Sequence, residues 1–561
     1  NNHFSADDLK DEIDTSEEGF FSFFTSSGDL NEIEVKNDVI RIESLYKNNG
    51  FIDAKVSDPI IDIGKESISI HFKLNEGAQY KVKSIDITGD LLKSKEEYKE
   101  LIGSKENEFY NREQVRKDVL ALTDTFLDSG FANAAISPVV DKDSDSKLMT
   151  VVYTIKKGEP VYFDRIRIIG NSKTRDKVIR RELKIEEGSL YSKKNIQISD
   201  KNIRRLDYFS GYEVKPVKTD KTNTMDLEVT VQEKETGAFS FGGGYSTEES
   251  AFGMISVMER NLFGKGLSGR VSFRASGESI LYSVGLYEPY IFDTNVSGGI
   301  DLYKEEKEYD HYDKDALGMS LSLGYKLYDY TRIGIRYNIE DYDISDVETG
   351  KTNMTPGSFL KSSIRPHITY DSRDSLFIPT EGQKHQVAFE YAGLGGDIEY
   401  IKYTGETSFY IPLLWKLVGL LHAEAGYIDD LTDGHPDIDW ARFYMGGMNS
   451  IRGFDNTDIN GQRSGDSIER GGEKYVQFNA EMTFPLLEDY QAAGVVFYDR
   501  GDVYRTSEDI DLADQYSSAG IGLRWNSPMG PLRIEYGWVI DGKDVKETGD
   551  GQFEFSVGTS F

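Results

Sequence analysis

The side chains that most often carry out chemistry are scarce and scattered in this sequence. It has no cysteine, and its seven histidines do not stand at the spacing of metal ligands. The glycine run at residues 242–244 lacks the flanking residues of a nucleotide-binding loop. Asp429, Asp430 and Asp437 could hold calcium weakly, but hydrated surface loops have the same composition. The sequence therefore predicts no enzyme and neither a cofactor nor a metal.

The elements of the chain are more informative, above all its last nine residues. In residues 553–561 the odd positions lean apolar and the even positions are polar, and the chain ends on an aromatic residue. One face of such a strand meets an apolar medium and the other meets water. A closed membrane barrel ends in this way, because its last strand pairs with its first and leaves no edge in lipid.

Composition sets further bounds. A chain of 561 residues is too long for one ordinary core, so at least two domains are expected. Only 38% of the residues are hydrophobic, yet 34 tyrosines, 30 phenylalanines and 54 glycines are present. This balance is typical of outer-membrane barrels, in which alternate residues face lipid. A net charge of −32 argues against nucleic acid as a partner.

The first half of the chain contains a repeat of about 80 residues. A helix that ends in a glycine and an aromatic residue is expected three times, at Gly50, Gly130 and Gly211, with each glycine as the left-handed cap. An alternating strand follows each glycine, at residues 68–74, 149–155 and 225–231. The order strand, helix, helix, strand, strand predicts α+β modules with the helices on one face of a short sheet.

We expect these modules at residues 1–80, 81–158 and 159–235. The first module lacks the opening strand of the others, so the chain is expected to be cut inside a longer array. In the third module, a helix with charged residues at i, i+4 spacing is expected at residues 175–183.

From residue 236 to 561 the sequence predicts an all-β transmembrane barrel of about 16 antiparallel strands. In residues 332–340, for example, the odd positions are apolar and most even positions are charged or polar, which predicts a polar lumen. Short turns alternate with long connections, the longest at about residues 429–471. Short turns of such barrels face the periplasm. The modules precede the first strand and are therefore expected in the periplasm, below a bacterial outer membrane.

Four passages resemble one known family. They are Gly446-Gly447 through Ile451-Arg452-Gly453-Phe454, then Phe497 through Gly501, then residues 519–531, and the junction at residues 233–245. Over essentially its whole length the chain resembles the BamA-type outer-membrane assembly proteins, in which POTRA modules precede a 16-strand barrel. An isolated Arg-Gly-Phe would by itself indicate only a turn.

The resemblance implies a lock between the long loop and the lumen. In the family this loop folds back into the barrel and its arginine pairs with the strand aspartate, which implies Arg452 with Asp499 and Glu481 as a further partner. A guanidinium binds a carboxylate with two parallel hydrogen bonds, which a lysine cannot reproduce. Gly453 would permit close backbone approach or a positive φ. The residues of the expected lock are Ile451, Arg452, Gly453, Phe454, Glu481, Asp499 and Gly501.

A second expected site is the seam between the first and last strands. Three consecutive glycines weaken the first strand, although they could equally serve a tight closure. The resemblance favours a lateral gate at which client barrels are templated by strand addition. The residues expected at this gate are Phe239, Phe241, Gly242, Gly243, Gly244, Tyr245, Phe553, Phe555, Val557, Gly558 and Phe561.

The partners implied by the resemblance are nascent outer-membrane barrel proteins, accessory BAM-type lipoproteins, periplasmic chaperones and outer-membrane lipid. Arg180, Arg181 and Glu182 are candidates for docking the accessory lipoprotein, although a charged helix face is more often only solvated. Two alternatives stay open: a TamA-type translocation and assembly relative, and a two-partner secretion pore. The pore usually has two modules and an N-terminal plug helix, and the sequence has neither.

Overall fold

The computed structural model describes residues 3–17, 30–64, 67–247, 250–375, 378–432, 436–464, 466–487, 492–527, 530–543 and 545–557. The chain forms two compact units. One comprises residues 1–171 and 179–233, and the other comprises residues 172–178 and 234–561. Among the described helices, none combines the length and the hydropathy needed to cross a lipid bilayer.

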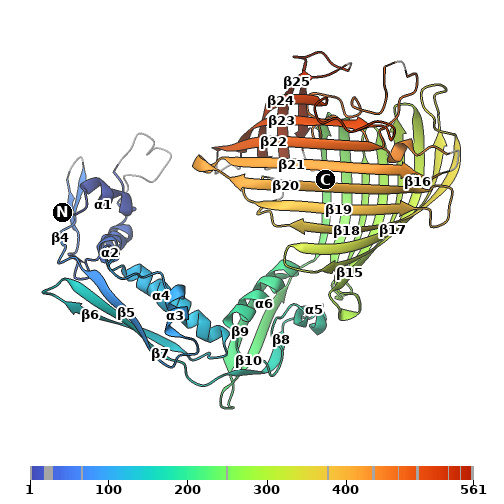
Figure 1. The fold of residues 1–561 in the computed structure, drawn as a ribbon. Coiled ribbons are helices and arrows are strands. Elements are labelled where there is room, and N and C mark those ends of the chain that lie inside the picture. Colours follow the sequence, from blue (N-terminus) through green and yellow to red (C-terminus); the bar gives the residue numbers. More distant parts are fainter. Residues whose placement is uncertain are drawn as a thin grey trace. The chain divides into compact units, whose positions relative to one another are not determined.

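The first unit repeats one α+β pattern. In the second module the sheet order is β5-β7-β6, with β5 parallel to β7, and α3 and α4 lie along the sheet (Figure 1). The third module repeats this order as β8-β10-β9. The elements are α1 (Ala6–Glu12), α2 (Glu32–Asn48), β1 (Lys55–Val56), β2 (Ile60–Ile63), β3 (Ile68–His71), β4 (Leu74–Asn75), β5 (Lys81–Gly89), α3 (Lys95–Leu101), α4 (Arg112–Asp128), β6 (Ala135–Asp143), β7 (Leu148–Lys156), β8 (Tyr162–Ile169), α5 (Asp176–Arg180), α6 (Lys193–Leu206), β9 (Phe209–Lys218) and β10 (Thr224–Glu233).

Three local expectations for the modules are wrong. Gly50 and Gly130 have the positive φ of a left-handed cap, but Gly211 lies inside β9, and Asp207 ends α6 with φ +56°. An aspartate tolerates this conformation, so the glycine was not needed there. The strand expected at residues 68–74 is divided, because β3 pairs with β2 whereas β4 pairs with β1. The helix expected at residues 175–183 shortens to α5, Asp176–Arg180.

A buried polar residue on the second helix fastens each module. Asp118 of α4 accepts hydrogen bonds from the backbone amides of residues 103 and 104 and from the Tyr153 hydroxyl. Asp38 of α2 binds the preceding loop in the same way, and in the third module Ser199 takes this position. Burial alone would raise the pKa of the Asp118 carboxyl, but these hydrogen bonds hold that pKa below its ordinary value.

The second unit is a closed antiparallel barrel of sixteen strands, β11 to β26, each paired with its neighbours in sequence, as predicted (Figure 1). The strands are β11 (Gly237–Ser246), β12 (Ser250–Leu262), β13 (Leu267–Ala275), β14 (Ser279–Glu288), β15 (Val296–Tyr309), β16 (Tyr312–Lys326), β17 (Thr331–Ser345), β18 (Gly357–Asp371), β19 (Gly382–Ala392), β20 (Tyr400–Pro412), β21 (Val418–Asp430), β22 (Lys474–Leu487), β23 (Ala492–Tyr504), β24 (Tyr516–Ser527), β25 (Gly530–Asp541) and β26 (Gly551–Val557). Three short turns, η1 (Ile291–Asp293), η2 (Leu414–Lys416) and η3 (Asp439–Ala441), lie in the connections, and Phe292 in η1 and Trp415 in η2 have positive φ.

The two faces of the barrel wall differ as the alternation predicts. Val257, Val271, Val284 and Leu302 are register partners on four adjacent strands, and about half of each side chain is exposed. Such a row forms an apolar outer band suited to lipid. On the inner face, charged residues such as Lys314 and Glu340 are less than 10% exposed and pair at 2.6 Å. The lumen is therefore polar but tightly filled.

Candidate functional site

The long connection between β21 and β22 spans residues 431–473, and its described residues (431–432, 436–464 and 466–473) pack against the inner wall of the barrel. Its most deeply buried apolar side chains are Ile438, Met445, Ile451, Phe454 and Ile459. They share one core cluster with strand residues that include Tyr475 and Val503. Burial of this extent gives the loop a fixed position inside the lumen. We call residues 431–473 the lumen loop.

Arg452 is the polar centre of the lumen loop and is only 2% exposed. Its Nε and Nη2 donate to the two carboxylate oxygens of Asp499 on β23, at 2.7 and 2.6 Å. Its backbone amide donates to the same carboxylate at 3.1 Å. Its Nη1 lies 2.7 Å from carboxylate oxygens of both Glu481 and Glu535. One guanidinium thus joins three strands of the wall, β22, β23 and β25.

Two further arginines extend this arrangement. Arg524 on β24 binds both oxygens of Glu481 at 2.8 Å, and its Nε binds Glu535 at 2.8 Å. Arg533 on β25 lies 3.2 Å from Glu535. The three arginines and the three carboxylates alternate in space, so each buried charge faces an opposite charge. We call Arg452, Glu481, Asp499, Arg524, Arg533 and Glu535 the Arg452 cluster.

Gly453 connects the lumen loop to the last strand. Its backbone amide donates to Glu554 of β26 at 2.7 Å, and Glu554 is fully buried. Gly453 has φ +92°, and a Cβ added there would lie 3.1 Å from the carbonyl oxygen of Gly537 on β25. Both the conformation and the space therefore require glycine.

Aromatic rings complete the packing of this site. The guanidinium of Arg452 lies 3.5 Å from the ring centroid of Phe497, which gives a cation–π contact. Phe454 packs edge-on against Tyr516 at 5.7 Å. A Cβ on Gly501 of β23 would lie 2.7 Å from the carbonyl oxygen of Val476 on β22 and 2.6 Å from the methyl carbon of Met445 in the loop. Close packing thus accounts for the small residue at position 501.

The sequence identified part of this site and missed the rest. Arg452, Gly453, Asp499 and Glu481 come together in the structure. Sequence reasoning did not select Arg524, Arg533, Glu535, Phe497 or Glu554. The available signal was that charged residues on strands with alternating polarity face the lumen, but this signal does not say which of them meet.

The seam between β11 and β26 is the second feature. Within the described residues, which end at 557, only Tyr245 and Ser246 have register partners on β26, namely Val557 and Ser556. One further backbone bond joins Thr247 to Phe555 at 3.2 Å. On its other side, β11 forms ten register pairs with β12. The described seam is therefore much shorter than the neighbouring strand pair.

The expected gate residues lie on both sides of this seam. Phe239, Phe241, Tyr245 and Phe553 are 66%, 80%, 49% and 66% exposed, whereas Phe555 and Val557 are half-buried. A Cβ on Gly244 would come within 1.8 Å of the Val557 carbonyl oxygen, so glycine lets the two backbones meet there. Gly242 and Gly243 precede it on β11. The expected residues Gly558 and Phe561 lie outside the described residues.

The candidate docking residues do not form one exposed helix face. Glu182 is 8% exposed, and Arg181 is half-buried. Arg180 donates to the carbonyl oxygen of Ile166 at 3.3 Å and lies 3.7 Å from Glu187. Of the three, Arg180 offers the most accessible charge, with a side chain 40% exposed.

Two of the three aspartates considered for calcium, Asp430 and Asp437, lie beside an arginine instead, and Asp429 belongs to β21. Asp437 and Asp430 lie 2.7 and 3.6 Å from the guanidinium of Arg442, and Asp439 and Glu473 lie 3.4 and 3.3 Å from it. Within the described part of the chain, no cluster of histidine, aspartate and glutamate has the arrangement of a metal site.

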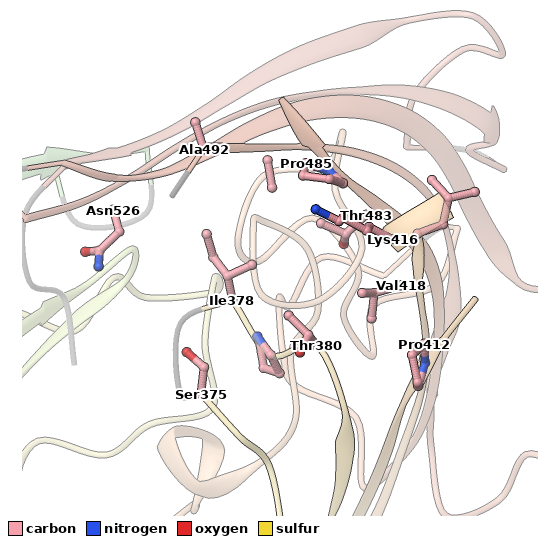
Figure 2. Close-up of a pocket in the computed structure, with 13 residues that line it drawn as sticks. Ser375, Ile378, Thr380, Pro412, Lys416, Val418, Thr483, Pro485, Ala492 and Asn526 are labelled. Carbon is pink, nitrogen blue, oxygen red and sulfur yellow. The ribbon is translucent and has the colours of Figure 1, made fainter. Parts of the chain in front are cut away.

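A cavity of about 570 Å³ opens near the short turns of the barrel, and Figure 2 shows side chains such as Ile378, Thr380, Val418 and Thr483 around it. Proline, valine, leucine and alanine dominate its described lining, which contains no histidine or carboxylate. This volume is in the range of ligand pockets, but the lining offers no acid–base pair.

Comparison with known proteins places this geometry in context. The family model described as the Omp85 superfamily domain matches residues 261–561, and a POTRA model, described as a surface antigen variable number repeat, matches residues 1–77, 80–158 and 161–234. The outer membrane protein assembly factor BamA of Nitratidesulfovibrio vulgaris is 32% identical over 571 residues, which cover 99% of this chain and 72% of that protein. Its counterpart in Neisseria meningitidis serogroup B is 25% identical and covers 100% of this chain and 77% of its own length. The crystal structure of BamA from Haemophilus ducreyi lacking POTRA domains 1–3 shares the fold, with a TM-score of 0.70, 21% identity, 86% coverage of this chain and 100% of that chain.

Proposed function

Because this chain belongs to the Omp85 superfamily, and within it to the BamA-type assembly factors, we propose that it assembles and inserts β-barrel proteins into the bacterial outer membrane. The barrel spans the outer membrane and the POTRA modules lie in the periplasm. Client strands are templated at a lateral gate between β11 and β26. The modules receive clients from periplasmic chaperones and bind accessory lipoproteins.

The observation that carries this proposal is the short seam. Most of β11 lacks a register partner on the described part of β26, while its other edge is fully paired with β12. An open strand edge is a template for another strand, because its N–H and C=O groups need partners. A client strand that pairs with β11 would satisfy these groups within the bilayer, where each unsatisfied backbone group costs several kcal/mol.

The local sequence of β11 supports the same reading. Gly242, Gly243 and Gly244 carry no side chains to hold a neighbouring strand, and glycine weakens a strand. Phe239 and Phe241 are exposed on this strand and offer apolar contact to lipid or to an incoming strand. A strand that is apolar on one face but weakly paired is suited to repeated exchange of partners.

The Arg452 cluster acts in this proposal as a lock on the lumen loop. It holds the loop against β22 to β25, and the bond from Gly453 to Glu554 reaches the last strand. The loop and one side of the gate would therefore move together. Arg452, Gly453 and Asp499 are the residues on which this role depends most.

The modules offer edges for extended segments. β6 and β9 are edge strands of their sheets, and Val139 on β6 is 54% exposed. Strand addition at such edges would hold clients before insertion. Arg180, the most accessible of the three candidate docking residues, is a weak candidate for contact with an accessory lipoprotein, and Arg181 and Glu182 contribute less because they are more buried.

Depletion of the protein tests the function directly. Outer-membrane barrel proteins should disappear from the envelope together, since all of them would need this gate. Selective loss of a single secreted protein would instead favour the two-partner secretion pore and contradict the proposal.

A disulfide across the seam tests the gate. The chain has no cysteine, so the pair Tyr245→Cys and Val557→Cys can be oxidised without side reactions. Cross-linking should stop client insertion in proteoliposomes, and reduction should restore it. The matched control is Val284→Cys with Leu302→Cys, register partners on the paired strands β14 and β15 away from the seam, whose cross-link should have no effect. Insertion by the oxidised 245–557 variant at the normal rate would refute the gate.

A further inference from the structure

The lumen loop has a second buried site far along the wall from the Arg452 cluster. Trp440, in η3, contacts two lysines of the inner wall: the Lys314 Nζ is 4.4 Å and the Lys361 Nζ is 5.0 Å from the centroid of its ring. Tyr342 and Tyr400 pack edge-on against the same indole, with centroids at 5.4 and 6.4 Å. These four residues belong to β16, β17, β18 and β20, and none of these strands contributes to the Arg452 cluster.

The two lysines are held in place by their own partners. Lys314 pairs with Glu340 at 2.6 Å, and Lys361 lies 3.4 Å from Glu390. Lys314 and Lys361 are 8% and 9% exposed. An ammonium over the face of tryptophan is attracted to the ring most strongly when water is excluded. The wall therefore presents a preformed cationic slot, and Trp440 fills it.

The segment between the two sites is held by contacts to the wall and to other parts of the lumen loop. Lys402 of β20 donates to the carbonyl oxygen of Ala441 at 2.7 Å, directly after Trp440. The guanidinium of Arg442 forms ion pairs with Asp437, Asp439 and Glu473, which lie on both sides of it in the sequence. Beyond Arg442, Phe443 pairs with Gly472 and Met445 pairs with Ile459. These contacts leave the segment few ways to absorb a displacement at one end.

We propose that residues 440–454 of the lumen loop form a strut across the barrel and that Trp440 is its positioning residue on the wall of β16 to β20. At the other end of the strut, Arg452 pairs with Asp499 on β23, and Gly453 donates to Glu554 on the last strand. The strut keeps the last strand within reach of β11. Release of Trp440 lets β22 to β26 move away with the loop still attached, so the closed form of the seam becomes rarer. This inference rests on the proposed function in one respect, namely that the seam between β11 and β26 opens and closes.

The test measures closure of the seam and not client insertion. Full-length protein carrying Tyr245→Cys and Val557→Cys is placed in phospholipid vesicles, and the rate of disulfide formation reports how often the seam is closed. Trp440→Ala should slow this rate about tenfold, which corresponds to about 1.4 kcal/mol. The matched control is Trp415→Ala, which removes an indole that is 88% exposed in the turn before β21 and should leave the rate unchanged.

Two further replacements of Trp440 separate the contribution of its aromatic face from that of its volume. Trp440→Phe keeps an aromatic face for the lysines and should restore most of the rate, whereas Trp440→Leu fills space without that face and should restore less. If Trp440→Ala does not fold, the paired change Lys314→Met with Glu340→Gln removes the cation without leaving a lone buried charge, and it should slow the rate several-fold with Trp440 in place.

An unchanged rate of cross-linking in Trp440→Ala, or in the Lys314/Glu340 variant, would overturn the strut. Equal rescue by leucine and phenylalanine would overturn the role of the lysine slot. Failure of the proposed gate would look different, because the cross-linked seam would then insert clients normally whatever the effect of Trp440 on closure.

Discussion

Replacement of Arg452 by methionine should release the lumen loop from the wall. Methionine fills a similar volume without charge or donors. The change removes two hydrogen bonds to Asp499 and the contacts to Glu481 and Glu535. Three buried carboxylates then remain with two guanidinium groups, those of Arg524 and Arg533.

The expected size of the effect follows from this imbalance. Removal of one partner from a buried ion pair costs about 3–5 kcal/mol, because the remaining charge is left in a poorly solvated site. Arg452→Lys keeps the charge but cannot reproduce the two-pronged bond to Asp499, and a lost hydrogen bond to a charged group costs about 1.5–3 kcal/mol. Arg452→Lys should therefore fall between the native protein and Arg452→Met.

The assay uses a cysteine at a buried position of the loop. Ile451 is fully buried, and Ile451→Cys would be the only thiol in the chain. Its labelling by a maleimide reports opening of the loop. A loss of about 3 kcal/mol raises the open population, and hence the labelling rate, roughly a hundredfold. The matched control replaces exposed Arg332 by methionine in the same Ile451→Cys background and should label at the native rate.

A double-mutant cycle sharpens the test. Asp499→Asn removes one of the stranded carboxylates, so Arg452→Met combined with Asp499→Asn should cost less than the sum of the two single changes. Strict additivity, or native labelling rates in Arg452→Met, would refute the idea that this ion cluster holds the loop.

Three further predictions follow from the same structure. Gly453→Ala should lower the thermal unfolding midpoint, because position 453 has φ +92° and a Cβ there is pressed against a carbonyl oxygen; an unchanged midpoint would contradict this. Arg442→Gln should loosen the lumen loop by about 3–5 kcal/mol through loss of the cation among four carboxylates, measured by the same labelling of Ile451→Cys. Asp118→Asn should destabilise the second module at neutral pH. The pKa of the Asp118 carboxyl is lower in the folded state than its unfolded value of about 4. The stabilisation from the ionised carboxylate is therefore present above the unfolded value and is lost as the pH falls through the folded pKa. Thermal melts of the full-length Asp118→Asn variant should converge with those of the native protein below the folded pKa.

The sequence was sufficient for the architecture because the bilayer restricts the possible solutions. Strands that cross a bilayer must close into a barrel, because no edge can be left unpaired in lipid, and the alternation of short and long connections gives the barrel its orientation. The repeat predicted the modules because their glycine landmarks recur at a constant spacing. Gly211 shows where this reasoning ends: the landmark is present in the sequence, but Asp207 caps the helix.

Only part of the candidate site could be predicted from the sequence, and the reason is physical. Alternation assigns Glu535 and Glu554 to the lumen, but their height relative to Arg452 depends on the stagger of strands around the barrel, and that stagger is set by closure of all sixteen. The lumen loop has no periodicity at all, so the insertion of Trp440 between Lys314 and Lys361 leaves no pattern in the sequence. The resemblance identified Arg452, Gly453, Glu481 and Asp499, whereas Arg524, Arg533, Glu535 and Glu554 became visible only in the folded barrel.

The seam and the lumen loop are held by different kinds of interaction, and this difference has a physical consequence. Among the described residues, the seam is held by a few backbone bonds. In the proposed function a client strand would replace them one for one, so the exchange would need little net free energy. The lumen loop is held by buried ions, which contribute less to stability than apolar packing would but which fix one geometry and tolerate no partial fit. A weak seam beside a strongly fixed loop means that a perturbation of the barrel is expressed first at β11 and β26. Weakening the loop at either Arg452 or Trp440 should therefore change the behaviour of the seam before it unfolds the barrel.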